Sequence, residues 1–126
     1  GRILTYKLTG DHATGSWSLV NDMIGTATNE RLGDYINITH NGNRISSYVY
    51  DSAMIIRVFD WNQSTNTWDI SHDFTAPVLS STGNGDFGPE HYMTSDGTKF
   101  YIESDQWSSN TSGDNVKRSI CIRTLP

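Results

Sequence analysis

The residues best suited to catalysis or metal binding are few in this sequence and lie far apart. Metal sites usually place at least two ligands a few residues apart along the chain. The single cysteine, Cys121, lies in an alternating run typical of a strand, which favours a role as a small strand residue. The histidines fall in different segments, share no metal-ligand spacing and are expected to have surface or packing roles: His12, His40, His72 and His91.

Other arrangements that would indicate an enzyme are missing from the sequence as well. It contains no nucleophile elbow, no phosphate-binding loop and no pair of carboxylates at an informative spacing. The sequence therefore predicts a protein that is not an enzyme, with no catalytic residues, no cofactor and no metal site.

Three asparagines lie in Asn-X-Ser/Thr sequons, which accept N-glycans in secreted proteins: Asn37, Asn62 and Asn110. A chain this rich in Asn, Ser and Thr also produces such matches by composition alone. Asn62 and Asn110 lie in polar segments expected to be turns, where a glycan is easily accommodated. Asn37 lies mid-strand between Ile36 and Ile38, and we expect it to face solvent because neighbouring strand residues point to opposite faces. The sequons favour covalent N-glycans and an extracellular location.

The tryptophans could stack on sugar rings, which would make the protein a lectin. Trp17 and Trp68 follow polar turns at similar points of two related segments, and this favours a packing role. Trp61 ends an apolar strand and is also expected to pack. Trp107 has no such explanation in a segment expected to be a loop, residues 106–115. It is therefore the candidate for carbohydrate contact.

Charge and hydropathy exclude two classes of partner. The formal net charge is -5, and acidic and basic residues are interspersed, so no basic stripe is present to neutralise phosphates. The longest apolar run, residues 53–56, is far too short to span a membrane. Asn, Ser, Thr and Gly are abundant, which favours short strands joined by turns over helices. We therefore expect an all-β fold that binds no nucleic acid and has no membrane span.

One segment of the sequence occurs twice. RLGDYINITHNGNRI begins at position 31, and DFGPEHYMTSDGTKF begins 55 positions later. Gly33 and Gly42 of the first copy correspond to Gly88 and Gly97 of the second. Asn-Gly and Asp-Gly between alternating strands are strong signals for a hairpin turn. The repeat therefore predicts two equivalent hairpins with Asn41-Gly42 and Asp96-Gly97 at their tips.

The repeat extends beyond these hairpins. The strand at residues 56–61 has counterparts at residues 3–8 and 120–125. A unit of about 50 residues with four short strands is typical of a propeller blade. By this division, residues 1–22 supply two strands of a partial blade, residues 23–74 a complete blade and residues 75–126 three strands of another.

The order of these motifs resembles the FG-GAP-like, integrin-alpha-type propeller repeat. That family is common in large secreted and surface proteins of microbes, algae and their viruses. The Gly-Ala-Pro element and the Asp-x-Asp-x-Asp-Gly calcium loop of the family are missing here, so its metal site does not carry over. The segments that carry the resemblance are residues 1–6, 15–17, 24–25, 31–33, 39–45 and 56–62.

A closed propeller needs at least about four blades, and this sequence predicts a little over two. We therefore expect propeller-blade-like, four-stranded antiparallel repeats that form an incomplete propeller or share strands between chains. Open strand edges are templates for a partner strand. The residues expected to line such edges in the strands at 3–8 and 116–124 are Ile3, Tyr6, Ile120 and Ile122.

The sequence thus predicts a secreted or surface-displayed, non-enzymatic glycoprotein module with a structural or adhesive role. Its expected partner is a second copy of itself, in a filament or a larger oligomer. The alternatives are a carbohydrate-binding propeller lectin and an excerpt of a larger extracellular ectodomain.

Overall fold

The computed structural model describes residues 1–27, 30–50, 54–75, 85–108 and 115–125. These ranges form strands and turns and include no helix. The described residues therefore contain no helix that is long and apolar enough to cross a membrane. The predicted all-β fold class is confirmed. The strands are β1 (Arg2–Thr9), β2 (Ser16–Ile24), β3 (Ile36–Ile38), β4 (Arg44–Tyr50), β5 (Met54–Asn62), β6 (Thr67–Thr75), β7 (Gly85–Met93), β8 (Lys99–Ser108) and β9 (Asn115–Thr124).

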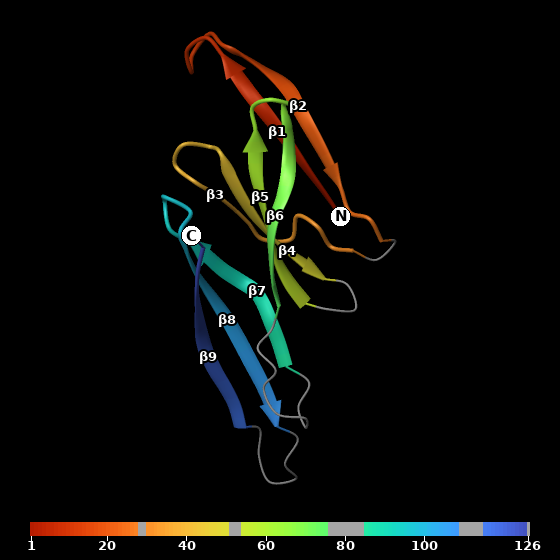
Figure 1. Ribbon diagram of the computed structural model, residues 1–126, viewed down its shortest axis with the longest axis vertical. Coiled ribbons are helices and arrows are strands. Elements are labelled where there is room, and N and C mark those ends of the chain that lie inside the picture. The colour runs from red at the N-terminus through yellow and green to blue at the C-terminus, as the bar shows by residue number, and fades with distance from the viewer. Residues whose placement is uncertain (28–29, 51–53, 76–84, 109–114, 126) are drawn as a thin grey trace.

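The strands form three antiparallel sheets that follow one another in chain order (Figure 1). The N-terminal sheet consists of β1 and β2, the middle sheet has the order β3-β4-β5-β6, and the C-terminal sheet has the order β7-β8-β9. Within each sheet every strand pairs with its neighbour in sequence, so the middle sheet is a four-stranded antiparallel meander, which is the arrangement of a propeller blade. Within the described chain, β9 pairs only with β8, and its second edge meets no strand there.

The hairpins β3–β4 and β7–β8 end in turns of the same geometry. In the first turn the Gly42 amide donates to the Thr39 carbonyl at 3.0 Å, and in the second the Gly97 amide donates to the Thr94 carbonyl at 2.8 Å. Gly42 and Gly97 have φ angles of 70° and 74°, which residues with a side chain rarely adopt. The predicted pair of equivalent hairpins with glycine at their tips is confirmed.

The pairing registers of β4–β5 and β8–β9 match as well. Ile45 pairs with Phe59 in the middle sheet, and Phe100 pairs with Arg123 in the C-terminal sheet. Phe100 follows Ile45 at the same separation as Gly97 follows Gly42. The two hairpins are therefore copies of one another in space and in sequence.

A bulge marks the same point in the N-terminal and middle sheets. The register shifts between Thr5 and Tyr6 where β1 pairs with β2, and between Val58 and Phe59 where β5 pairs with β6. Thr5 therefore corresponds to Val58, and Tyr6 corresponds to Phe59. A bulge bends a strand and re-aims its side chains, so this coincidence shows that β1–β2 has the geometry of β5–β6.

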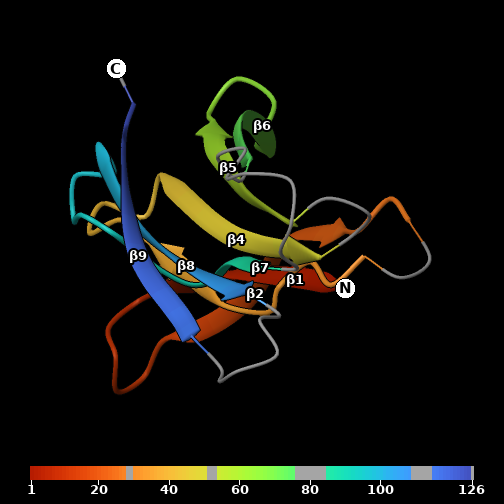
Figure 2. The ribbon, with the colours of Figure 1, turned by 90° about the horizontal axis from the view of Figure 1, so that it is seen from below.

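The core lies between the sheets, which are stacked face to face. Because strand residues alternate between faces, the middle sheet contacts one neighbour with each face. The cluster that it forms with the N-terminal sheet consists of Ile3, Met23, Leu32, Ile45, Val49 and Phe59. The cluster that it forms with the C-terminal sheet consists of Tyr48, Ile56, Val58, Phe74, Phe100, Ile102 and Leu125. Strand β9 lies at the outside of the molecule in both views (Figures 1 and 2).

The other repeated pair of glycines lies where a sheet approaches the one before it. Gly33 and Gly88 have φ angles of 98° and 83°. A Cβ added to Gly33 would lie 2.7 Å from the carbonyl oxygen of Arg2 and 3.4 Å from Cγ1 of Ile3, and one added to Gly88 would lie 2.7 Å from Cδ1 of Ile56. The repeat thus places a glycine of one sheet against an equivalent isoleucine of the preceding sheet. This close approach is the physical reason for repeating the glycine.

Candidate functional site

The titratable residues singled out in the sequence do not come together. Among the residues that the structure describes, no group of three or more His, Cys, Asp or Glu side chains could hold a metal ion. His12, His40 and His72 are exposed, whereas His91 is buried. Cys121 is half-buried and packs against the cluster between the middle and C-terminal sheets. These five residues serve surface and packing roles.

His91 lies at the junction between the middle and C-terminal sheets. Its Nε2 and the Ser46 hydroxyl are 3.0 Å apart and share a hydrogen bond. Burial lowers the pKa of His91 to about 4, and interactions with the backbone of Gly88 and Ser46 only partly oppose this effect. The imidazole is therefore neutral near neutral pH and acts as a polar part of the core.

A buried carboxylate joins the middle sheet to the turn after β2. Burial alone would raise the pKa of Glu30, but the amides of Ala27 and Thr26 and the nearby Arg57 charge lower it overall. Arg57 donates from Nη1 to Glu30 Oε1 at 3.1 Å, and from Nε to Asp73 Oδ1 at 2.9 Å. Every one of these groups has a partner, so the cluster is structural.

The face of the N-terminal sheet that points away from the middle sheet is largely apolar, and no other described segment covers it. We call it the N-terminal outer face. The register places its members on one side of the sheet, because Tyr6 pairs with Leu19 and Arg2 pairs with Ile24. An ion pair between Arg2 and Asp22 crosses the same face. Its exposed apolar side chains are Leu4, Tyr6, Trp17, Leu19 and Ile24.

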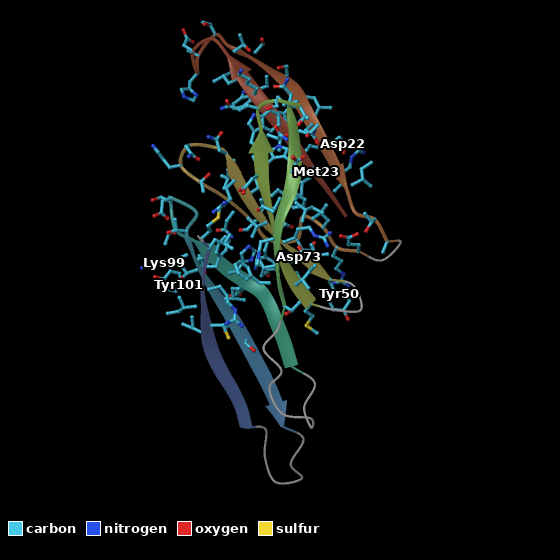
Figure 3. The ribbon with its side chains drawn as sticks, viewed as in Figure 1. Asp22, Met23, Tyr50, Asp73, Lys99 and Tyr101 are labelled. Carbon is cyan, nitrogen blue, oxygen red and sulfur yellow. The ribbon has the colours of Figure 1, made fainter. Side chains whose placement is uncertain are left out.

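The C-terminal sheet has a matching uncovered face on its side away from the middle sheet, which we call the C-terminal outer face. Tyr92 pairs with Tyr101, which in turn pairs with Ile122, so these three side chains share one side. The exposed apolar side chains of this face are Tyr92, Tyr101, Ile120 and Ile122. Figure 3 shows Asp22 and Met23 near one end of the molecule and Tyr101 in the sheet at the other end. The two outer faces therefore terminate the stack at opposite ends.

The residues predicted to line assembly edges divide between these faces and the core. Tyr6, Ile120 and Ile122 are exposed on the outer faces, but Ile3 is only 4% exposed and belongs to the inner cluster. The expectation that Ile3 is available to a partner is wrong, because alternation along β1 turns its side chain towards the middle sheet. Tyr92 and Tyr101 were not predicted from the sequence, although each alternates with buried or half-buried neighbours.

The predictions for the tryptophans need correction. Trp107 lies in β8, where it pairs with Val116 of β9, and not in a loop. Strand β8 continues to Ser108, further than the polar composition of residues 106–115 indicated. Trp17 is 65% exposed on the N-terminal outer face, whereas Trp68 packs against the inner cluster and donates from Nε1 to the Thr5 hydroxyl at 3.2 Å. Equivalent positions thus have different environments, because only Trp68 has a sheet in front of it.

The sequons lie in different settings. Asn37 is half-buried and does not face solvent as expected, since its Nδ2 donates to the His91 carbonyl of the C-terminal sheet at 2.9 Å. Asn62 ends β5, where its Nδ2 donates to Asp69 Oδ2 at 2.7 Å and its Oδ1 accepts from the Ser64 amide at 2.9 Å. Asn110 lies outside the described residues.

The fold resembles that of a protein from Lactobacillus plantarum whose crystal structure is known. The two structures agree with a TM-score of 0.53 over 95% of this chain, at 10% sequence identity. The match covers 34% of the other chain, so this chain spans about a third of that protein's length. At such low identity the likeness shows a shared β-rich fold and nothing of function. No protein family matches the sequence, and no curated protein matches it either.

Proposed function

We propose that this protein is a non-enzymatic module with a structural or adhesive role, and that it works as a subunit of a filament or larger oligomer. The observation that carries the proposal is the pair of apolar outer faces at opposite ends of the sheet stack. Large contiguous apolar patches on soluble proteins usually mark interaction sites. Two such faces on opposite sides of the stack favour a role in assembly.

The repeat type that we propose is the FG-GAP-like propeller repeat. The support is the order of its motifs and the recurrence of paired glycines in two copies, Gly33 with Gly42 and Gly88 with Gly97. All four have positive φ angles. The calcium loop of that family is missing from the sequence, so the proposal includes no metal.

We further propose that the module is secreted or displayed on a cell or virion surface and carries N-glycans. The support is the three sequons, of which Asn62 is the most favourable because its hydrogen bonds lie in an exposed turn.

A carbohydrate-binding lectin is the second candidate, and one observation favours it. Tyr6 and Trp17 are exposed aromatic side chains on the same outer face, and such rings can stack on sugars. Trp107 stays a candidate from the sequence alone. Glycan-array binding that is lost in Trp17→Ala or Trp107→Ala would favour the lectin over the structural module.

The proposed function is tested on native material by electron microscopy combined with peptide mapping after enzymatic deglycosylation. We expect particles or fibres that contain several copies, with a glycan at Asn62. Native protein that is a single copy and carries no glycan at any sequon would contradict the proposal.

A further inference from the structure

We infer that the two outer faces are the two halves of one interface, so that the C-terminal outer face of one molecule binds the N-terminal outer face of a second copy. This inference rests on the proposed function, because it names the partner and the orientation of the assembly. Copies joined in this way form a heterologous, head-to-tail contact, which produces either rings or filaments.

The first argument comes from equivalent positions in β5 and β9. Ile45 and Phe100 are equivalent residues of the repeat, and their strand partners are Phe59 and Arg123, so these two also correspond. Counting back along each strand, Ile56 and Val58 correspond to Ile120 and Ile122. Ile56 and Val58 are 0% exposed, because the C-terminal sheet covers them. Ile120 and Ile122 are 71% and 59% exposed. The same positions of the repeat are therefore fully buried on β5, where the C-terminal sheet covers them, and exposed on β9.

The second argument concerns the opposite side of the repeat. Phe59 and Trp68 face the N-terminal sheet and contact its cluster. Their counterparts at the N-terminal end are Tyr6 and Trp17, which are exposed. The positions that β5 and β6 use to bind the sheet before them thus recur on β1 and β2 as large aromatic side chains with nothing in front.

The orientation follows from the internal junctions. The side of β1 that carries Ile3 contacts the side of the middle sheet that carries Phe59. The opposite side of the middle sheet, which carries Ile56, contacts the C-terminal sheet. At each junction, the side of a sheet that carries Ile3 or its equivalent Ile56 packs against the side of the next sheet that lacks the equivalent isoleucine. Bringing Ile120 of one molecule against Tyr6 of another repeats that order, whereas joining like faces would reverse it.

Burial of apolar side chains is the main favourable contribution to protein association, which gives a second copy a reason to bind. On the N-terminal outer face the ionic groups Arg2 and Asp22 already form an ion pair with each other. No unpaired charge from that ion pair has to be desolvated when the faces meet.

The test uses the unglycosylated 126-residue chain and two variants, each with one face blocked by acidic residues. One carries Tyr6→Glu with Leu19→Glu, and the other carries Ile120→Glu with Ile122→Glu. The sites are exposed, so both variants should stay folded, which circular dichroism checks. Ile70→Glu is the matched control, because Ile70 is 56% exposed but lies on neither outer face.

Sedimentation of the variants, alone and mixed, gives the answer. We expect each blocked variant to be monomeric alone, the 1:1 mixture to form a dimer that grows no further, and Ile70→Glu to associate like the unmodified chain. Self-association of either blocked variant would show that like faces bind, and would overturn the inference. A mixture that remains monomeric would overturn it equally. Neither result would alter the glycan and particle observations that test the proposed function.

Discussion

Arg44 joins the two equivalent hairpin turns, because its Nη1 donates to the carbonyl oxygen of Gly97 at 2.7 Å. The same guanidinium donates from Nε and Nη2 to the carboxylate of Asp60 at 2.6 and 2.9 Å. The hydrogen bond from Arg44 lowers the pKa of Asp60. Beside it, the His40 amide donates to the Ser95 carbonyl at 3.0 Å. One side chain therefore ties the middle and C-terminal sheets together at the level of their turns.

Replacing Arg44 with methionine should lower the free energy of unfolding by about 1 to 2 kcal/mol. The change removes the bond to Gly97 and leaves Asp60 without its partner, and the partial exposure of the pair moderates the cost. Lys99→Met is the matched control, since Lys99 is the exposed counterpart of Arg44 in the second hairpin, and it should change stability by less than about 0.5 kcal/mol. Urea unfolding of both variants checks this. Equal losses would contradict a special role for Arg44.

Gly88→Ala should destabilise the chain, and Ile56→Val should partly restore it. A Cβ at Gly88 would lie 2.7 Å from Cδ1 of Ile56, which is the methyl group that valine lacks. Gly42→Ala is the control, because Gly42 has a positive φ of 70° but nothing within 4 Å of an added Cβ.

We expect Gly88→Ala to cost about 1 to 3 kcal/mol more than Gly42→Ala, since overpacking adds to backbone strain. A double-mutant cycle of Gly88→Ala with Ile56→Val should give a favourable coupling of about 0.5 to 1.5 kcal/mol. Additive effects would mean that Gly88 and Ile56 are not in contact.

The stability of the fold should fall as the pH falls from about 6.5 to about 4. Burial lowers the pKa of His91 from 6.5 to about 4. Because the folded chain keeps this ring neutral, the unfolded chain binds more protons in this window, and acidification favours unfolding. One pKa unit corresponds to about 1.4 kcal/mol, so the loss approaches roughly 3 kcal/mol at the lower limit.

Urea unfolding at a series of pH values measures this loss. His91→Asn should flatten the dependence over the same window, because no titratable ring remains there. His72→Asn, at an exposed position, should preserve it. An unchanged slope in His91→Asn would assign the effect to other groups.

Asn62→Gln should remove one N-glycan from material made in a eukaryotic secretory pathway. The hydrogen bonds of Asn62 lie in an exposed turn at the end of β5. We expect less modification at Asn37, because its amide donates to the His91 carbonyl at the part-buried junction with the C-terminal sheet, whereas the Asn62 amide donates to Asp69 in an exposed turn. Intact-mass measurement before and after deglycosylation compares the sites. An unmodified Asn62 together with a modified Asn37 would reverse the expected ranking.

The sequence predicted the repeating features of the fold well, because they depend on local chemistry. Gly42 and Gly97 occupy turn positions that demand a positive φ, and such positions are visible in sequence as Asn-Gly and Asp-Gly. Strand alternation likewise predicted that Ile120 and Ile122 share a face. These features require no knowledge of what lies in front of the strand.

The predictions that failed concern which side of a strand meets a neighbouring sheet. Strand alternation places the Asn37 side chain on the face opposite to Ile36 and Ile38. It does not show which of the two faces another sheet covers. The position of β7 decided it, by placing the His91 carbonyl against Asn37. Ile3 was misplaced for the same reason, since only the stacking of sheets turns its side of β1 inward. Face-to-face stacking is a long-range property that a single strand does not encode.

Sedimentation equilibrium of the unmodified chain over a wide concentration range tests the central claim most directly. If the two outer faces bind each other, the measured mass should rise with concentration above the 14.1 kDa of one chain, through multiples of that mass. A mass that remains at one chain up to about millimolar concentration, where even a weak complex worth about 4 kcal/mol would be half formed, would contradict it.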